Sequence, residues 1–204
     1  MAAHPQDRRV ALLRGVNVGT ANRVAMADLR GLFEDLGYAG VRTLLNSGNV
    51  VFTVSRDPSR DHASRIEKAV ADRLRVRSPV VVLTRKEVAA AVEANPFPSI
   101  AHDPARLLVV AFREPEALAW VKPLLKERWA PESLALGSRV AYLWCAQGIV
   151  DSRLWAAVNR AAGDRCTARN LTTMTKILAL LERRMAGPVR RPLTKRRRPA
   201  SRPR

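Results

Sequence analysis

Apolar runs and helical patterns alternate through the first part of the chain. Residues 10–13 form a continuous apolar run, which is typical of a buried strand. Between residues 26 and 36, apolar side chains recur every three or four positions, and Gly37 follows where a left-handed helix cap belongs. The pattern therefore predicts a strand, a loop rich in glycine and asparagine, and a helix with one apolar face.

A hairpin follows this helix. Residues 41–45 and 50–54 are β-branched and apolar, and the short polar segment between them fits a tight turn. The elements predicted after the hairpin are a helix at about 60–75, a strand at 79–83, and a helix that begins at the capping box Thr84-Arg85-Lys86-Glu87 and ends before Pro96.

The remaining elements repeat this order. Another apolar run at 107–112 is followed by a helical pattern that starts at Glu114-Pro115, and then by two short strands joined at Gly137-Ser138. The predicted elements are strands at 107–112, 133–136, 140–144 and 166–169, and helices at about 114–125, 152–162 and 172–184.

This order of elements predicts an α+β fold with two tandem ferredoxin-like (βαββαβ) halves and additional helices. We expect a flexible N-terminus at 1–9, a first half at 10–98, a second half at 99–184, and a disordered Arg/Pro-rich basic tail at 185–204. The repeat rests on the order of the elements and not on matching residues.

The net charge of +18 is strongly uneven along the chain. Residues 183–204 hold ten of the 36 Arg and Lys residues and no Asp or Glu, so more than half of the excess belongs to this segment. A charged tail can hold nucleic acid weakly and without sequence preference, but it says little about the folded surface.

Cysteine and histidine are too sparse to predict a metal site. The two cysteines are far apart in sequence, and the three histidines have no second ligand at a suitable spacing. We therefore expect no metal and no cofactor. The chain lacks the apolar segment of a signal peptide and any run long enough to span a bilayer, which predicts a cytoplasmic protein without a membrane partner.

Two polar segments of the first half are candidates for binding. Arg14 and Asn17 lie in the glycine-containing loop between a strand and a helix, and Asn46, Ser47 and Asn49 lie in the hairpin turn. In a β-α-β-β unit these two segments lie at the same end of the sheet, so we expect the five side chains to converge. Each segment taken alone fits an ordinary loop or turn equally well.

A third polar segment lies near the end of the predicted fold. Arg169, Asn170, Thr173 and Lys176 surround the predicted start of the last helix. Free backbone N–H groups and the helix dipole favour an anion there, although a hydroxyl or amide at this position is also an ordinary helix cap.

Five ordered motifs resemble the bacterial domain-of-unknown-function 1697 family. They are Leu13-Arg14-Gly15-Val16-Asn17-Val18-Gly19, Met26 with Leu29-Arg30, Ser47-Gly48-Asn49-Val50-Val51-Phe52, Asn95-Pro96-Phe97, and Thr167-x-Arg169-Asn170-x-x-Thr173-x-Thr175-Lys176.

The resemblance covers about residues 8–184 and implies two ferredoxin-like α+β halves, without an established biochemical activity. The chain departs from the family pattern at four positions, which are Thr20, Asn46, Leu171 and Thr172. The last two replace an aromatic residue and an asparagine, which weakens any expectation of a stacking role near residue 171.

Three functions fit the sequence. The first is binding of a small anionic or nucleotide-like ligand at the Arg/Asn site, for which arginine supplies charge-assisted hydrogen bonds. The second is a structural or interaction role in which the same residues brace the two halves. The third is nucleic-acid binding through the basic body and tail, although Phe52 is the only aromatic residue on the strands that would stack bases. The three polar segments contain no His, Cys or carboxylate, so catalytic residues cannot be assigned.

Overall fold

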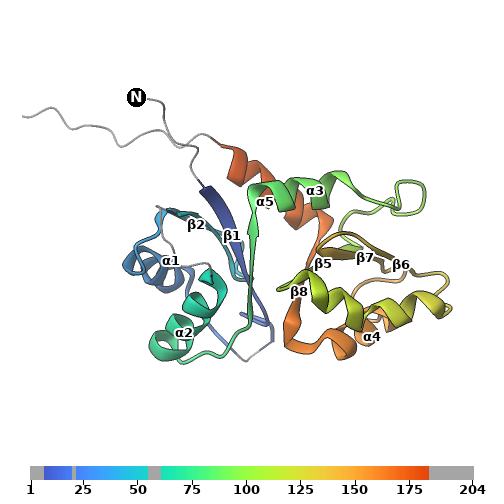
Figure 1. Cartoon of the computed structure of the whole chain (residues 1–204), viewed down its shortest axis with the longest axis horizontal. Helices are drawn as coiled ribbons and strands as arrows, with labels where there is room; N and C mark the ends of the chain where they lie inside the picture. Colours follow the sequence, from blue (N-terminus) through green and yellow to red (C-terminus); the bar gives the residue numbers. More distant parts are fainter. Residues whose placement is uncertain (1–6, 20–21, 55–60, 184–204) are drawn as a thin grey trace, which may run out of the picture.

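The computed structural model describes residues 7–19, 22–54 and 61–183. The predicted disordered tail at 185–204 lies outside the described residues, as does most of the predicted flexible N-terminus. The described part folds into two four-stranded antiparallel sheets with helices around them, which confirms the prediction of a mixed α/β protein (Figure 1).

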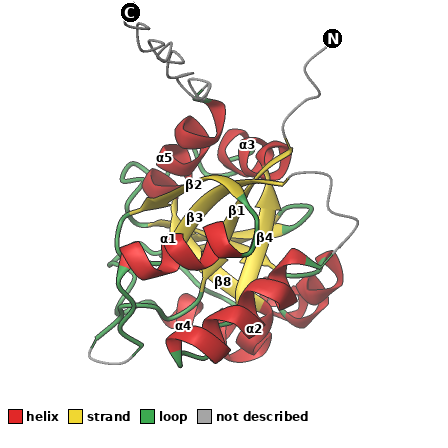
Figure 2. Ribbon diagram, turned by 90° about the vertical axis from the view of Figure 1, so that its left-hand side faces the viewer, coloured by secondary structure: helices red, strands yellow, loops and turns green. Residues whose placement is uncertain are grey.

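The first sheet has the strand order β2-β3-β1-β4. It contains β1 (Asp7–Leu13), β2 (Ala39–Leu44), β3 (Asn49–Val54) and β4 (Val80–Thr84). Helices α1 (Met26–Asp35) and α2 (His62–Leu74) cover its outer face, as Figure 2 shows. Asp61 caps α2 by accepting a hydrogen bond from the backbone N–H of Ser64.

The second sheet has the matching order β6-β7-β5-β8. It contains β5 (Leu107–Phe112), β6 (Ser133–Leu136), β7 (Val140–Trp144) and β8 (Cys166–Asn170). Its outer face packs against α4 (Arg153–Ala162) and the 3-10 helices η1 (Pro115–Trp120) and η2 (Lys122–Lys126). A third 3-10 helix, η3 (Gly163–Arg165), leads into β8.

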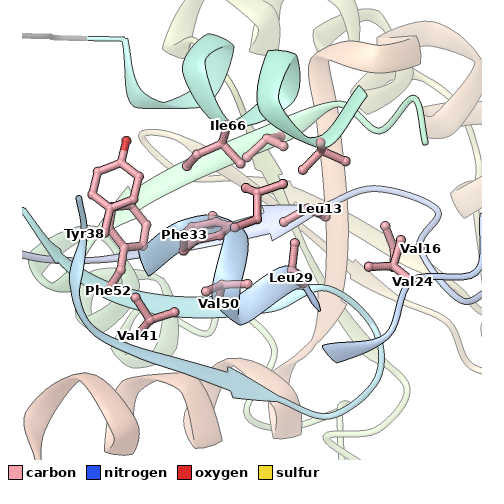
Figure 3. Packing of buried hydrophobic residues seen from close by; sticks show 14 of the residues in the cluster. Leu13, Val16, Val24, Leu29, Phe33, Tyr38, Val41, Val50, Phe52 and Ile66 are labelled. Atoms are coloured by element: carbon pink, nitrogen blue, oxygen red, sulfur yellow. The ribbon is translucent and has the colours of Figure 1, made fainter. Parts of the chain in front are cut away.

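Three apolar clusters hold these layers together. The first lies between the first sheet and α1 and α2, and Figure 3 shows Phe33, Phe52 and Tyr38 at one end of it and Leu13 and Val16 towards the other. The third lies between the second sheet and its outer helices. The second cluster takes residues from the inner faces of both sheets and from α3 (Arg85–Glu93) and α5 (Leu171–Glu182), which pack against each other. We call the boundary between the two sheets the seam.

The structure differs from the sequence prediction at two elements. β1 begins at Asp7, three residues before the predicted strand and inside the segment expected to be flexible. The helix expected over 114–125 is two 3-10 helices instead of an α-helix. Pro123 explains the second difference, because proline has no N–H to donate and its ring clashes with the preceding turn of an α-helix.

None of the helices in the described part of the chain is long and apolar enough to cross a membrane.

Candidate functional site

Arg169, at the end of β8, connects the two halves. All five N–H donors of its guanidinium have acceptors, which is the maximum that arginine can satisfy. Nε donates to the side-chain oxygen of Asn49 at 2.5 Å. The other four bonds run to the carbonyls of Leu13, Ser47 and Ala168, each at 2.8 Å, and to the hydroxyl of Thr167 at 3.1 Å.

None of these acceptors is a carboxylate. Burial lowers the pKa of Arg169 to about 10, which still leaves the side chain charged at neutral pH. Among the residues that the structure describes, no acidic side chain forms an ion pair with Arg169. This part of the seam therefore holds a positive charge that neutral hydrogen-bond acceptors solvate but do not neutralise.

The hairpin turn between β2 and β3 supplies two of these acceptors. Asn49 is fully buried and donates from its amide to the carbonyl of Leu44 at 2.9 Å and to the hydroxyl of Ser47 at 3.0 Å. Gly48 has φ +70°, and a Cβ there would lie 2.8 Å from the Cβ of Leu13. Only glycine fits this position without strain, so the turn holds Ser47 and Asn49 against the guanidinium.

Arg14 crosses the seam in the opposite direction. Its guanidinium donates to the carbonyls of Gly163 at 2.6 Å and Cys166 at 2.8 Å, and to the side-chain oxygen of Asn159 at 2.7 Å. The carboxylate of Asp164 lies 3.8 Å away and is well exposed. Arg14 thus closes the end of α4 and the start of β8 onto the first half.

Asn17 holds the loop after β1 in place. It adopts φ 55°, and its side chain accepts a hydrogen bond from the N–H of Val24 at 2.9 Å. The amide donates to the carbonyl of Val24 at 2.9 Å and to that of Asn46 at 2.8 Å, so it joins the loop to the hairpin turn. The contribution of Asn46 to this contact comes from its backbone, and its side chain is exposed.

The start of α5 is capped by the protein itself. Asn170 accepts from the N–H of Thr173 at 2.9 Å and donates to the carbonyl of Ala105 at 3.3 Å. The N–H of Thr172 donates to the carbonyl of Pro104 at 3.4 Å. Lys176 is exposed one turn further along.

A pocket of about 290 Å³ opens on the seam beside Arg169. Four of the nine site residues expected from the sequence line it: Ser47, Arg169, Asn170 and Thr173. The other five, Arg14, Asn17, Asn46, Asn49 and Lys176, are not part of its wall. The remaining wall is formed by Gly15 and by apolar residues of both halves: Leu13, Val16, Val18, Leu108, Ile149, Trp155 and Ala168.

Sequence reasoning missed part of this wall. Leu108, Ile149 and Trp155 come from the second half and carry no local motif. The sequence signal for this wall is the apolar pair Ile149-Val150 in a predicted loop. In the structure, Val150 is 95% exposed.

Two further arginines of the second half bridge the seam through ion pairs. Arg113 donates to the two carboxylate oxygens of Glu67 at 2.8 and 2.9 Å and to the hydroxyl of Ser64 at 2.7 Å. Burial opposes the charged form of Arg113, but the hydrogen bond and charge of Glu67 outweigh it and raise its pKa. Arg139 donates to the carboxylate of Glu87 and to the carbonyl of Val82 at 3.2 Å. Neither arginine was a candidate from the sequence.

Other hollows on the surface are lined by opposite charges. One of about 200 Å³ contains Arg113 and Arg139 with the carboxylates of Asp61 and Glu87. A larger depression of about 670 Å³ contains Lys68 and Arg77 together with Glu67 and Asp164. Both hollows therefore contain carboxylates beside their basic residues, whereas the wall of the pocket beside Arg169 contains no carboxylate.

The faces of both sheets are covered. Phe52 is completely buried beneath α1 and α2, and Val51 on the opposite face of β3 is buried in the seam. Bases cannot stack on the central strands of the first sheet, which is the mode that RNA-binding sheets of this kind use.

Comparisons with known proteins place the chain in a family. A solved structure of a conserved bacterial protein from Streptococcus pneumoniae resembles it with a TM-score of 0.67 and 24% sequence identity, over 87% of this chain and 100% of that one. This structural similarity shows that the two proteins share a fold. No curated protein was found to be similar to this chain. The family model for proteins of unknown function DUF1697 matches residues 7–142. The chain therefore belongs to the DUF1697 family, as its motifs predicted.

Proposed function

We propose that this protein binds a small ligand with an anionic or hydrogen-bond-accepting group in the pocket beside Arg169. The observation that carries the proposal is the charge of Arg169, which lines the pocket and has only neutral acceptors. The charge of such a partly buried arginine attracts an anion more strongly than that of a fully exposed one. The volume of about 290 Å³ lies at the small end of ligand pockets.

Two hydroxyl groups add donors to this charge. Thr173 has no side-chain hydrogen bond to any described residue, and Ser47 accepts a bond from Asn49 while its own proton has no acceptor among them. Both residues line the pocket. The site predicted from the sequence therefore divides into residues that line the pocket and residues such as Arg14, Asn17 and Asn49 that lie behind its walls.

A structural role is the second candidate, and one observation favours it. Every donor of Arg169 is already used within the protein, and Arg14 has four hydrogen bonds across the seam, one of them to the sulfur of Cys166. The arginines brace the two halves in either case. If the role is purely structural, the hydroxyls of Ser47 and Thr173 contact no ligand. Replacing a pocket hydroxyl therefore distinguishes the structural role from ligand binding.

The fold supports a finer assignment of the architecture. We infer that each half is a ferredoxin-like unit, that the two form an internal repeat, and that they meet near residues 98 and 99. The shared antiparallel order, β2-β3-β1-β4 and β6-β7-β5-β8, supports this inference. A cytoplasmic location and weak nucleic-acid binding by the basic tail remain predictions from the sequence.

Ligand binding is tested by thermal unfolding of the full chain with a panel of small anions and neutral acceptors. A ligand that binds only the folded state raises the melting temperature. The variant Thr173→Val removes a pocket hydroxyl at constant shape. Thr175→Val is its matched control on the same helix, because Thr175 is exposed and donates to the carbonyl of Leu171.

Binding at the pocket predicts a melting shift that Thr173→Val weakens and Thr175→Val leaves intact. If no compound in the panel shifts the melting temperature, the structural role is correct and the binding proposal is wrong.

A further inference from the structure

We infer that the ligand of this pocket is a small monoanion with an apolar body, such as a short aliphatic or aromatic carboxylate, and not a phosphate ester or a nucleotide. This inference rests on the proposed function, because it specifies the ligand of the same site.

The walls of the pocket are suited to an apolar body. Seven of its twelve lining residues are apolar side chains, and they come from both halves of the chain. Leu13, Val16 and Leu108 are almost completely buried and belong to the apolar clusters, so they fix this wall in the core but expose little apolar area of their own. Trp155 adds a flat aromatic wall, and Val18 is 67% exposed although it lines the same pocket. Covering such surface removes apolar area from water, which favours binding.

The polar groups are suited to one carboxylate. Four side-chain donors of the wall have a proton without an acceptor in the described structure: the hydroxyls of Ser47 and Thr173, one amide N–H of Asn170 and the indole N–H of Trp155. A carboxylate has two oxygens, and the charge of Arg169 provides one compensating positive charge without needing a further hydrogen bond. Donors and charge therefore match a single monoanion.

A phosphate dianion carries twice the charge that Arg169, the one cationic residue of the wall, can offset. Phosphate sites at helix starts use free backbone N–H groups. At α5 the N–H of Thr172 donates to Pro104 and that of Thr173 donates to Asn170. All donors of Arg169 are occupied, and Lys176 is not part of the wall. A dianionic phosphate would lose part of its hydration here while only one of its two charges is compensated.

The test is calorimetry on the full chain with four probes: octanoate, phenylacetate, inorganic phosphate and adenosine monophosphate. We expect at least one of the two carboxylates to bind at least tenfold more tightly than either phosphate probe. The double variant Ser47→Ala/Thr173→Val should reduce carboxylate affinity by about a hundredfold, since each lost hydrogen bond to a charged group costs about tenfold in affinity. The control Thr175→Val should retain the original affinity.

The outcomes separate this inference from the proposed function. Binding of phosphate or the nucleotide in preference to both carboxylates overturns the inference and leaves a ligand pocket in place. Carboxylate binding that is identical in the double variant overturns the inference, because the carboxylate would then bind elsewhere. No binding by any probe, together with no shift in the wider thermal panel, overturns both proposals.

Discussion

Apart from Arg14, which has both carbonyl acceptors and the carboxylate of Asp164 nearby, the arginines described at the seam form two groups that differ in whether a carboxylate offsets their charge. Arg113 and Arg139 face the carboxylates of Glu67 and Glu87, and their charges are offset. Arg169 faces carbonyls, an amide and a hydroxyl, and its charge is not offset. Both groups join the same two halves. The difference indicates that the ion pairs hold the seam closed, whereas Arg169 both braces the seam and gives the adjoining pocket a positive potential.

The largest expected loss of stability follows replacement of Arg169, and the comparison is with replacement of an ion-paired arginine. Arg169→Met should lower the free energy of unfolding by about 3 kcal/mol, because several partly buried acceptors lose their donors at once. Arg113→Met should cost about 1 kcal/mol or less, because that pair is partly exposed and screened. Equilibrium denaturation of both variants measures the difference. Equal losses would mean that the two groups of arginines do not differ in the way described.

A substitution in the turn that presents Ser47 and Asn49 to Arg169 should cause a smaller loss of stability. Gly48→Ala should lower the free energy of unfolding by about 1–3 kcal/mol, because the residue has positive φ and the added Cβ would meet Leu13. Gly19→Ala is the control, since Gly19 has φ +62° but no atom within 4 Å of a Cβ. Denaturation should show a greater loss for Gly48→Ala. The same loss in both variants would show that the contact with Leu13 is unimportant.

The stability contributed by the ion pair between Glu87 and Arg139 should decrease in acid. Burial would raise the pKa of Glu87, but hydrogen bonds from Thr84 and Arg139 outweigh it, so the pKa lies below the ordinary value of 4.5. A lowered pKa contributes stability above pH 4.5 that is lost as the pH falls through the value in the folded protein. The contribution is about 1 kcal/mol, because the pair is partly exposed.

Glu87→Gln tests this dependence at constant size. Glutamine can still complete the capping box with Thr84, so the variant removes the charge and leaves the helix start. Melting temperatures between pH 6 and pH 3 should fall less steeply in Glu87→Gln than in the original protein. Glu93→Gln, on the exposed end of the same helix, should retain the original slope. Parallel curves for all three proteins would contradict the role of Glu87.

Local signals in the sequence were sufficient for most of the elements. The capping box of Thr84 and Glu87 is present, and the apolar runs at 10–13 and 107–112 lie within strands. The order of elements predicted a mixed fold, which the two four-stranded sheets confirm. The prediction of an α-helix over 114–125 was wrong, because the apolar spacing is helical but Pro123 cannot donate the hydrogen bond that a continuous α-helix needs there.

The site was less accessible to sequence reasoning because it depends on contacts between distant residues. The motifs drew attention to Arg169, but its five acceptors come from β1, the hairpin turn, the start of β3 and β8. Arg113 and Arg139 lie among many arginines, and nothing in their neighbourhood distinguishes them until Glu67 and Glu87 are brought opposite. The apolar wall containing Leu108 and Trp155 has the same pattern as ordinary core.

Octanoate and octanamide have nearly the same shape and differ in charge, so a comparison of their affinities shows whether the charge of Arg169 selects the ligand. If the uncompensated charge of Arg169 selects the ligand, calorimetry at neutral pH on the full chain should show octanoate binding about tenfold more tightly, and Thr173→Val should weaken it. Equal affinities for the acid and the amide would contradict the central claim, since the charge at the seam would then contribute nothing to binding.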